Sequence, residues 1–154
     1  MTYDLEKLLP HKPPMIFLSG VSSIDFDKGE LVAWFEVKES DVGYCPKMKG
    51  VPGYAALEYM AQAVGCFVGA HDLKEDPNGV PGAGFVLGTR SLDVHTEVFG
   101  LSQRYFVRVS ALFCDESIAS FDCVVYNDKQ ETLATALLNA YRPESMADFM
   151  KEYA

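Results

Sequence analysis

One segment of the sequence, Tyr54 to Ala70 (YAALEYMAQAVGCFVGA), restricts the possible folds more than any other. Its alanines, Leu57 and Met60 favour a helix, and it lacks the alternation of polar and apolar residues that marks a strand. Nearly every face of such a helix is apolar, so it must be buried on nearly all sides. A membrane span is the alternative, but seventeen residues that include Glu58 and Gln62 and lack basic flanks fit one poorly. We therefore predict a helix inside a protein core.

The segments on either side of this helix have the composition of strands. Residues 15–27 (MIFLSGVSSIDFD) and 31–39 (LVAWFEVKE) are rich in branched and aromatic residues, and the turn residues Asp27 to Glu30 predict a hairpin between them. Residues 40–53 contain three glycines and two prolines and predict an irregular loop. Four further strand-like segments follow the helix: residues 84–98, 103–114, 118–127 and 132–142. Short helical turns are expected at residues 4–9 and 144–154.

Together these segments predict an α+β fold in a single domain that spans residues 1–154. An antiparallel sheet usually has one face that must be covered, and here one helix that is apolar on all sides is the available cover. The sheet must therefore curl around the helix. A chain of this length can bury such a core without a metal ion or a disulfide to hold it.

The charge of the chain restricts its partners. Lys and Arg number 13 and Asp and Glu number 22, which gives a net charge of −9. A protein that binds nucleic acid or an anionic membrane needs a basic face, so we expect neither partner and no membrane insertion. The N-terminal sequence MTYDLEKLLPHK lacks the basic start and apolar run of a secretion signal, and we predict a cytoplasmic protein.

The cysteines show neither the C-x-x-C pattern nor a histidine at the spacing of a metal site. They are Cys45, Cys66, Cys114 and Cys123. In a chain without a secretion signal we expect them to be reduced and to pack as small buried hydrophobic residues. The sequence accordingly predicts no bound metal ion and no cofactor.

Glu58 is the strongest candidate for a catalytic residue on physical grounds. An ionised and unpaired carboxylate inside an apolar helix costs on the order of several kcal/mol, so this group should stay protonated or find a buried partner. A carboxylic acid that is neutral near physiological pH is suited to act as a general acid. Gln62 lies four residues later on the same helical face, so the two polar side chains form one stripe. The alternative is that Glu58 faces solvent at the open end of the helix.

The three histidines occupy different settings. His11 lies within Pro10 to Pro14 (PHKPP), where three prolines restrict the backbone and hold the side chain to few orientations. Such rigidity suits a catalytic base and a buried hydrogen-bonded bracket equally well. His71 follows the predicted helix and is expected to interact with its C-terminal dipole. His95 falls on the polar face of a predicted strand, where it meets solvent or a partner.

Gly53 follows Pro52 and precedes the helix. The first backbone N–H groups of a helix have no acceptor within it and carry partial positive charge, so a substrate carbonyl placed there would be polarised as in an oxyanion hole. The alternative is that these two residues only begin the helix.

Two motifs are similar to those of a known family. The segment LLPHKPPMIFLSGV (residues 8–21) resembles the opening segment of the 3-hydroxyacyl-acyl-carrier-protein dehydratases. VPGYAALEYMAQAVG (residues 51–65) resembles their central-helix signature, Pro-Gly followed by L-E-A-M-A-Q. The pairing of PHKPPM with LEYMAQ looks closest to the ApeP-like branch, which is associated with aryl-polyene biosynthesis, and the likeness spans about residues 5 to 142. It implies the hotdog fold, a curved antiparallel sheet wrapped around one long helix.

The resemblance also implies roles for individual residues. The catalytic acid of the central helix falls on Glu58, and the glycine whose amide polarises the thioester carbonyl falls on Gly53. The glutamine one turn later falls on Gln62, which is expected to contact substrate. The family's catalytic histidine, in an H-F-P-G loop, aligns with Tyr44, and a phenol is a poorer base than an imidazole at neutral pH. Either His11 is therefore the base, or the chain is a degenerate subunit.

The implied function is dehydration of a 3-hydroxyacyl thioester, linked to acyl carrier protein, to the trans-2-enoyl thioester. His11 would remove the α-proton, the Gly53 N–H would stabilise the enolate-like charge, and protonated Glu58 would protonate the leaving β-hydroxyl. Two alternatives stay open. One is hydrolysis of a thioester on the same fold, and the other is a non-catalytic subunit that completes the tunnel of an active hotdog partner.

The family pattern further implies a homodimer or a heterodimer with another hotdog subunit, joined sheet edge to sheet edge, or a higher oligomer. The acyl tunnel would then lie between the subunits. Met60, Phe67 and Phe85 could line this tunnel or belong to the core. Docking of an acidic carrier protein would need a local basic patch, for which Lys12, Lys47 and Lys49 are candidates, although these lysines could simply solubilise their loops.

Overall fold

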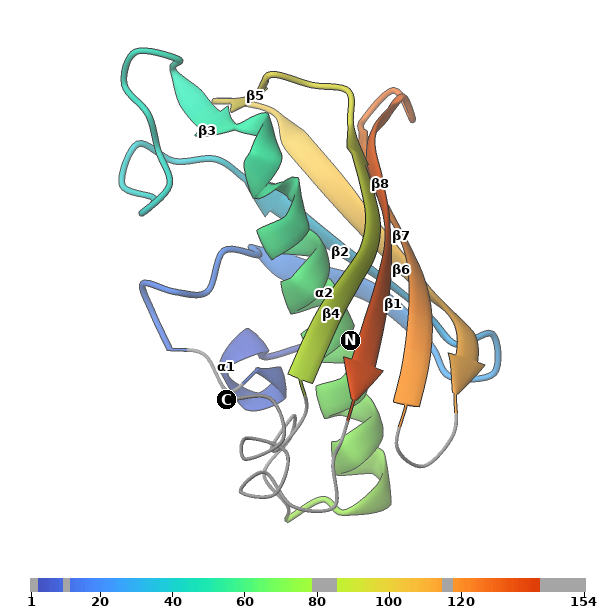
Figure 1. Ribbon diagram of the computed structural model, residues 1–154. Helices are drawn as coiled ribbons and strands as arrows, with labels where there is room; N and C mark the ends of the chain where they lie inside the picture. The colour runs from blue at the N-terminus through green and yellow to red at the C-terminus, as the bar shows by residue number, and fades with distance from the viewer. Residues whose placement is uncertain (1–2, 10–11, 79–85, 115–117, 142–154) are drawn as a thin grey trace, which may run out of the picture.

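A curved antiparallel sheet partly encloses one long helix (Figure 1). This is a computed structural model, and it describes residues 3–9, 12–78, 86–114 and 118–141. The arrangement is the predicted α+β fold. The long helix is so rich in apolar side chains that the sheet must bend around it to bury them.

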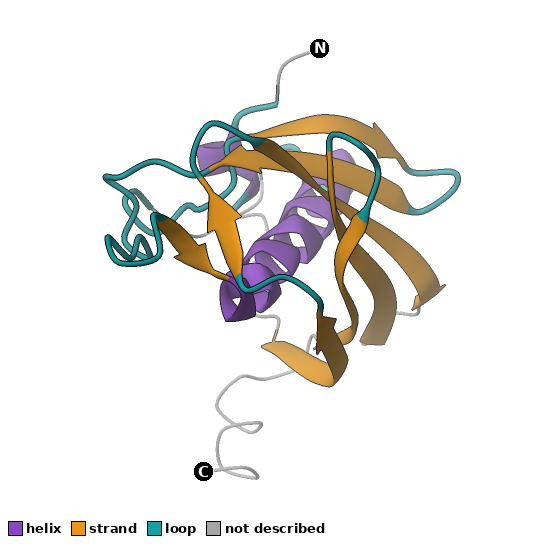
Figure 2. Ribbon diagram, turned by 90° about the horizontal axis from the view of Figure 1, so that it is seen from above, coloured by secondary structure: helices purple, strands orange, loops and turns teal. Residues whose placement is uncertain are grey.

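The helices and strands follow one another in the predicted order, and two short strands, β3 and β5, were not predicted. They are α1 (Leu5–Leu8), β1 (Gly20–Asp25), β2 (Glu30–Glu36), β3 (Gly50–Pro52), the 3₁₀ turn η1 (Gly53–Ala55), α2 (Ala56–Glu75), β4 (Val86–Val94), β5 (Val98–Gly100), β6 (Arg104–Cys114), β7 (Ile118–Asn127) and β8 (Thr132–Tyr141). The large sheet has the strand order β1-β2-β6-β7-β8-β4, and all neighbouring strands are antiparallel. β3 and β5 form a separate two-stranded sheet beside the start of α2 (Figure 2).

The central helix is longer than predicted. It continues past Ala70 to Glu75, because no helix-breaking residue occurs before Pro77. The residue before a proline disfavours helical backbone, and Asp76 is accordingly the extended C-cap. His71 therefore lies within the helix and is exposed, so its predicted position at the C-terminal end is wrong. Lys74 is the basic residue of the last turn.

The N-terminal hairpin begins later than predicted. Its first strand starts at Gly20 instead of Met15, because the Gln62 side chain takes up the backbone hydrogen bonds of the preceding residues. The predicted turn is present, and Gly29 adopts φ 68°, a left-handed conformation that glycine tolerates at little cost. The predicted helical turn at residues 4–9 is α1, whose Asp4 side chain accepts a hydrogen bond from the Glu6 N–H at 3.0 Å.

Two predicted segments are divided by the pairing of β3 with β5. The loop predicted over residues 40–53 contains β3, and the strand predicted over residues 84–98 ends as β4 at Val94, before β5 begins at Val98. Strands of three residues are too short to show an alternation of polar and apolar side chains, so no local pattern predicts them. The helical tail predicted at residues 144–154 lies outside the described residues.

An aromatic cluster forms the core at the N-terminal half of α2. The rings of Phe35 and Tyr59 stack at 3.6 Å between centroids, with 5° between their planes. Phe99 packs edge-on against both rings, and Tyr105 stacks on Phe35 at 5.1 Å. This cluster joins the helix to both sheets and fixes the orientation of the first helical turns.

Two predicted tunnel residues belong to the core. Met60 is fully buried, and Phe67 is buried against Phe121 at 5.6 Å between ring centroids. Of the two predicted roles, tunnel wall or core, both side chains therefore have the core role within this chain. The third candidate, Phe85, lies outside the described residues.

Cys66 and Cys123 confirm the prediction of unpaired, buried thiols, whereas the side chain of Cys114 lies outside the described residues. Cys66 and Cys123 are buried and free, and Cys45 is half-buried and free. Burial raises the pKa of the Cys66 thiol to about 12. Burial also raises the pKa of Cys123 to about 12, with a smaller contribution from the Asp122 carboxylate. Both thiols are therefore neutral and inert in the folded protein at physiological pH.

These shifts predict a loss of stability at alkaline pH. Unfolding returns each thiol to its ordinary pKa of 9.0, so between about pH 9 and 12 the unfolded state releases protons that the folded state retains. Each thiol should then lower the free energy of unfolding by up to about 1.4 kcal/mol per pH unit. Urea unfolding at several pH values between 8 and 11 measures this slope. The control is Cys66→Ala combined with Cys123→Ala, and an equally steep slope in that variant would contradict the assignment.

Candidate active site

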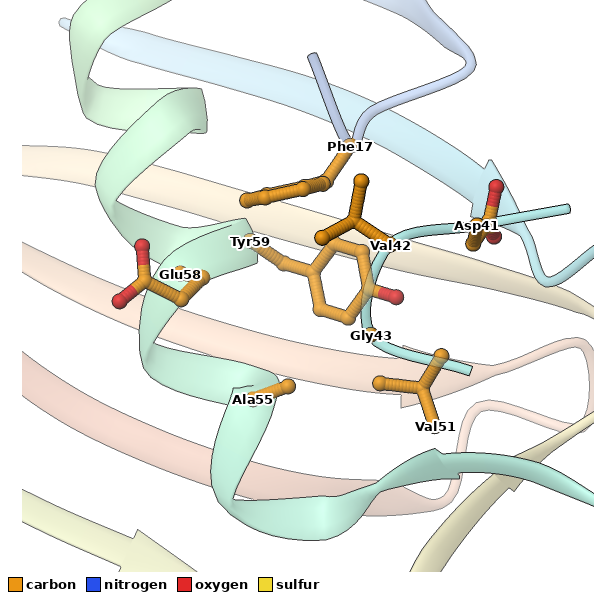
Figure 3. A pocket seen from close by; sticks show the side chains of 8 residues that line it. All are labelled: Phe17, Asp41, Val42, Gly43, Val51, Ala55, Glu58 and Tyr59. Atoms are coloured by element: carbon orange, nitrogen blue, oxygen red, sulfur yellow. The ribbon is translucent and has the colours of Figure 1, made fainter. Parts of the chain in front are cut away.

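A cavity of about 120 Å³ lies beside the first turns of α2, between the helix and the loop at residues 41–43 (Figure 3). Its walls are almost entirely apolar, and three of the residues that form them carry a polar side chain. The lining residues are Phe17, Asp41, Val42, Gly43, Val51, Ala55, Glu58 and Tyr59. Sites for organic ligands are mostly apolar with a few polar groups, and this cavity has such a lining but is smaller than the roughly 300–1,000 Å³ of a typical ligand pocket.

Glu58 lines this cavity, but its side chain is exposed. The prediction that it lies within the core is wrong for the single chain, and the alternative, exposure at the open end of the helix, is what the structure shows. The physical reason is the shape of the sheet, which lies along one side of α2 and leaves the other side open (Figure 2). Glu58 therefore lies at the rim of the cavity, and its carboxyl group points away from the Tyr59 side chain (Figure 3).

Gln62 is buried, with 3 % of its surface exposed, and it binds the segment that follows the PHKPP motif. Its Oε1 accepts hydrogen bonds from the N–H groups of Phe17 at 2.8 Å and Leu18 at 3.3 Å. Its Nε2 donates to the Met15 carbonyl oxygen at 2.6 Å. The side chain thus joins this segment to α2 and places Phe17 at the cavity, which is a structural role; its predicted contact with substrate stays a prediction.

The backbone N–H of Gly53 donates to the Glu97 carbonyl oxygen at 2.8 Å. The donor predicted for a substrate carbonyl is therefore already occupied, because β3 pairs with β5 at this point. A Cβ atom at Gly53 would collide with the Thr96 carbonyl oxygen, so this close approach requires glycine. The next backbone N–H group belongs to Tyr54 and has no acceptor within the helix that it begins. The Tyr54 residue is 77 % exposed.

Tyr44 lies immediately after the loop that borders the cavity. Its N–H donates to the Asp41 carbonyl oxygen at 3.0 Å, and its half-buried ring packs against the core. Asp41 shapes the loop, because its Oδ2 accepts from the Lys38 N–H at 2.9 Å. The cavity is lined by Gly43, the neighbour of Tyr44, and the structure does not bring Tyr44 together with Glu58 in its wall.

Neither His71 nor His95 lines the cavity. His11 lies outside the described residues. His95 is exposed, as predicted, and its backbone N–H donates to the Leu133 carbonyl oxygen at 2.8 Å.

Tyr59 is a cavity residue that was not predicted from the sequence. Its ring is only 4 % exposed, and its side chain lines the cavity (Figure 3). Burial raises the pKa of the Tyr59 hydroxyl, and the Asp41 carboxylate raises it further. An aromatic residue in an apolar helix is normally predicted to be a core residue. The only signal of another role was the hydroxyl group, because a phenylalanine would pack equally well at this position.

A wider, shallower depression of about 630 Å³ adjoins the helix start. It is bordered by Cys45, Met48, Gly53 and Tyr54, together with the end of β4 at Val94. Within the described part of the chain, no three His, Cys, Asp or Glu side chains are grouped as metal ligands. Nor does any helix described here have the length and apolar character needed to cross a membrane.

Comparison with known proteins identifies relatives by sequence. The profile of the ApeP-like family, described as ApeP dehydratase, matches residues 3–151. The 3-hydroxyacyl-[acyl-carrier-protein] dehydratase FabZ of Chlamydia caviae is 36 % identical over 69 residues, which cover 43 % of this chain and 45 % of the relative. The FabZ of Chlamydia muridarum is 33 % identical over the same extent. The chain thus matches somewhat less than half the length of these curated relatives.

Solved structures share the fold at lower sequence identity. The dehydratase heterocomplex ApeI:P from Xenorhabdus doucetiae aligns with a TM-score of 0.84 at 23 % identity and covers 99 % of both chains. The HP0420 homologue from Helicobacter felis aligns at 0.65 with 8 % identity, covering 91 % of this chain and 88 % of the other. The E. coli PaaI protein aligns at 0.58 with 14 % identity, covering 79 % and 81 %. These likenesses confirm the predicted hotdog fold.

The family profile agrees with the two motifs from which the resemblance was inferred. It covers the PHKPPM segment, the LEYMAQ helix and the strands that enclose this helix. Because the match extends over nearly the whole chain, the protein belongs to the ApeP-like family of dehydratases.

Proposed function

We propose that this protein dehydrates a 3-hydroxyacyl thioester, carried by acyl carrier protein, to the trans-2-enoyl thioester. The observation that carries the proposal is the apolar cavity at the start of α2, which Glu58 helps to line in a member of a dehydratase family. An apolar cavity accepts an acyl group, and a carboxyl group at its edge can exchange a proton with a substrate oxygen.

In the proposed reaction, His11 removes the proton from C2 and Glu58 protonates the departing 3-hydroxyl group. Water leaves, and the electron pair of the C2–H bond becomes the new double bond. Because the Glu58 side chain is exposed in the single chain, it needs cover from a second subunit to hold a proton in an apolar setting.

A second hotdog subunit can provide this cover. In the described sheet, β4 has a hydrogen-bonded neighbour on one side only, β8, and natural proteins usually cover such an edge. We propose a dimer joined at β4, with an identical chain or with another hotdog subunit. The solved ApeI:P relative is itself a dehydratase heterocomplex, which supports the second possibility. Light scattering that finds only a 17.0 kDa species, alone and after mixing with a hotdog partner, would contradict this.

We propose a single domain over residues 1–154, a cytoplasmic location, and a pathway of fatty-acid or aryl-polyene type. Lys47 and Lys49 are exposed and flank Met48, which borders the depression at the helix start. With Lys12, also exposed, they are the candidate docking points for an acidic carrier protein against the net negative charge of the chain.

Incubation with a 3-hydroxyacyl thioester on acyl carrier protein tests the function. The expected product is the trans-2-enoyl thioester. A free thiol would instead indicate hydrolysis. If neither product forms with the chain alone but the enoyl product forms faster when it is added to an active hotdog dehydratase, the chain is a non-catalytic subunit.

His11→Ala tests the proposed base. Loss of a general base commonly costs about 10²–10⁴-fold in rate, so we expect dehydration to slow by that factor. Circular dichroism and light scattering should show an unchanged fold and oligomer. Near-full activity of this variant would assign the base to another group.

A further inference from the structure

We propose that the Tyr59 hydroxyl donates a hydrogen bond to the thioester carbonyl oxygen of the bound substrate and stabilises the negative charge that develops there. This inference rests on the proposed dehydration and assigns a second catalytic residue to it. When the base removes the C2 proton, the electron pair of the C2–H bond moves towards the carbonyl, and the oxygen becomes enolate-like. When the C3–O bond breaks, that pair forms the double bond and the hydroxyl leaves as water with the proton from Glu58.

A donor other than Gly53 is needed at this oxygen. The Gly53 N–H, which the resemblance implies for this role, already donates to the Glu97 carbonyl oxygen at 2.8 Å. Tyr59 follows Glu58 in α2, and both side chains line the same cavity (Figure 3). The Tyr59 hydroxyl points towards the loop at Asp41 and Gly43, whereas the Glu58 carboxyl group points away from it (Figure 3). A thioester bound in this cavity therefore lies beside Tyr59, with Glu58 at the rim.

The Tyr59 hydroxyl is available to a ligand. None of the hydrogen bonds among the described residues uses it, and every fully buried side-chain oxygen in that part of the chain has a partner. The hydroxyl must therefore be open to the cavity, although the residue as a whole is only 4 % exposed. A polar group in a mainly apolar cavity favours a ligand that supplies the missing hydrogen bond.

The ring of Tyr59 is held rigidly. It stacks on Phe35 at 3.6 Å, and its other contacts are edge-on, with Phe99 at 5.7 Å and Phe17 at 6.5 Å between centroids. Phe17 is itself fixed by the hydrogen bond from its N–H to Gln62. A donor fixed before the substrate binds needs no rearrangement when charge develops, and this is the main source of stabilisation in an oxyanion hole.

The hydroxyl also keeps its proton. Burial and the Asp41 carboxylate both raise the pKa of Tyr59, so the group is a neutral donor throughout the physiological range and cannot replace the base. The Asp41 carboxylate on the same cavity disfavours a ligand that is already anionic. A neutral thioester, which becomes negative only during the reaction, fits this combination.

The test is Tyr59→Phe, which removes one oxygen atom and keeps the stacked ring. An acyl thioester without the 3-hydroxyl group isolates the proton-removal step, because the enzyme can exchange its C2 hydrogens with deuterated water but cannot eliminate. We expect Tyr59→Phe to slow this exchange, and kcat for dehydration, by about 10²–10³-fold with KM little changed. An exchange rate equal to that of the unmutated protein in Tyr59→Phe would overturn the inference.

Tyr105→Phe is the matched control. Tyr105 stacks on the same Phe35 ring, but its hydroxyl accepts from the Gly100 N–H at 2.8 Å and donates to Gln103 Oε1 at 3.3 Å. This variant should lower the melting temperature and leave the exchange rate unchanged, whereas Tyr59→Phe should keep the melting temperature. An equal loss of exchange in both variants would reduce Tyr59 to a packing role and overturn the inference.

Two further measurements separate this inference from the function on which it rests. The infrared stretch of a ¹³C-labelled thioester carbonyl should move to lower frequency on binding to the unmutated protein and less so on binding to Tyr59→Phe; equal shifts would overturn the inference alone. Absence of both exchange and dehydration in the unmutated protein, with and without a hotdog partner, would overturn the proposed function and this inference with it.

Discussion

Glu58→Gln is expected to reduce the rate of dehydration by about 10²–10⁴-fold, the usual effect of removing a general acid or base. The substitution keeps the size of the side chain and its ability to form hydrogen bonds, but an amide has no proton to give to the departing hydroxyl group. Because the side chain is exposed at the edge of the cavity, the fold should not change. Conversion of a 3-hydroxyacyl thioester to its enoyl product, followed by the absorbance of the conjugated double bond, measures the effect.

Glu75→Gln is the matched control, since Glu75 is an exposed residue at the opposite end of the same helix. It should leave the rate unchanged. If Glu58→Gln dehydrates as fast as the control, Glu58 is not the acid. If both variants lose activity together with their helical circular dichroism, the loss reflects the helix and not the carboxyl group.

Gln62→Leu is expected to lower the free energy of unfolding by about 3–5 kcal/mol, since each buried polar group left without a partner costs about 1–3 kcal/mol. Leucine has a similar volume but cannot replace the three hydrogen bonds to the backbone at Met15, Phe17 and Leu18. Urea unfolding gives the energy, and hydrogen exchange should show faster exchange of the Phe17 and Leu18 amides.

Gln103→Leu provides the comparison. Gln103 is exposed, and its Oε1 accepts a single bond from the Tyr105 hydroxyl at 3.3 Å, so we expect a loss below about 1 kcal/mol. Should Gln62→Leu instead keep its stability and raise KM, Gln62 would contact substrate as the resemblance implies, and the structural role would be wrong.

The candidate site could be predicted only in part from the sequence. The LEYMAQ motif located Glu58 on the central helix, and the structure places that residue at the edge of the cavity. Gly53 was correctly located at the helix start, but its N–H is occupied by Glu97, a residue 44 positions away in the chain. Tyr59 was missed, because whether an aromatic side chain in an apolar helix borders a cavity depends on packing and not on local pattern.

The sequence by itself determined the central helix, the antiparallel strands around it and the family. Helices and strands follow from periodicity and turn residues, and these are local properties of the chain. Only the tertiary structure decided that Glu58 is exposed, that Gln62 binds the backbone at residues 15–18, and that β3 pairs with β5. Each of these joins segments far apart in the sequence, and the curvature of the sheet fixes which face of the helix stays open. That curvature is a property of the packed core, and no short stretch of residues contains it.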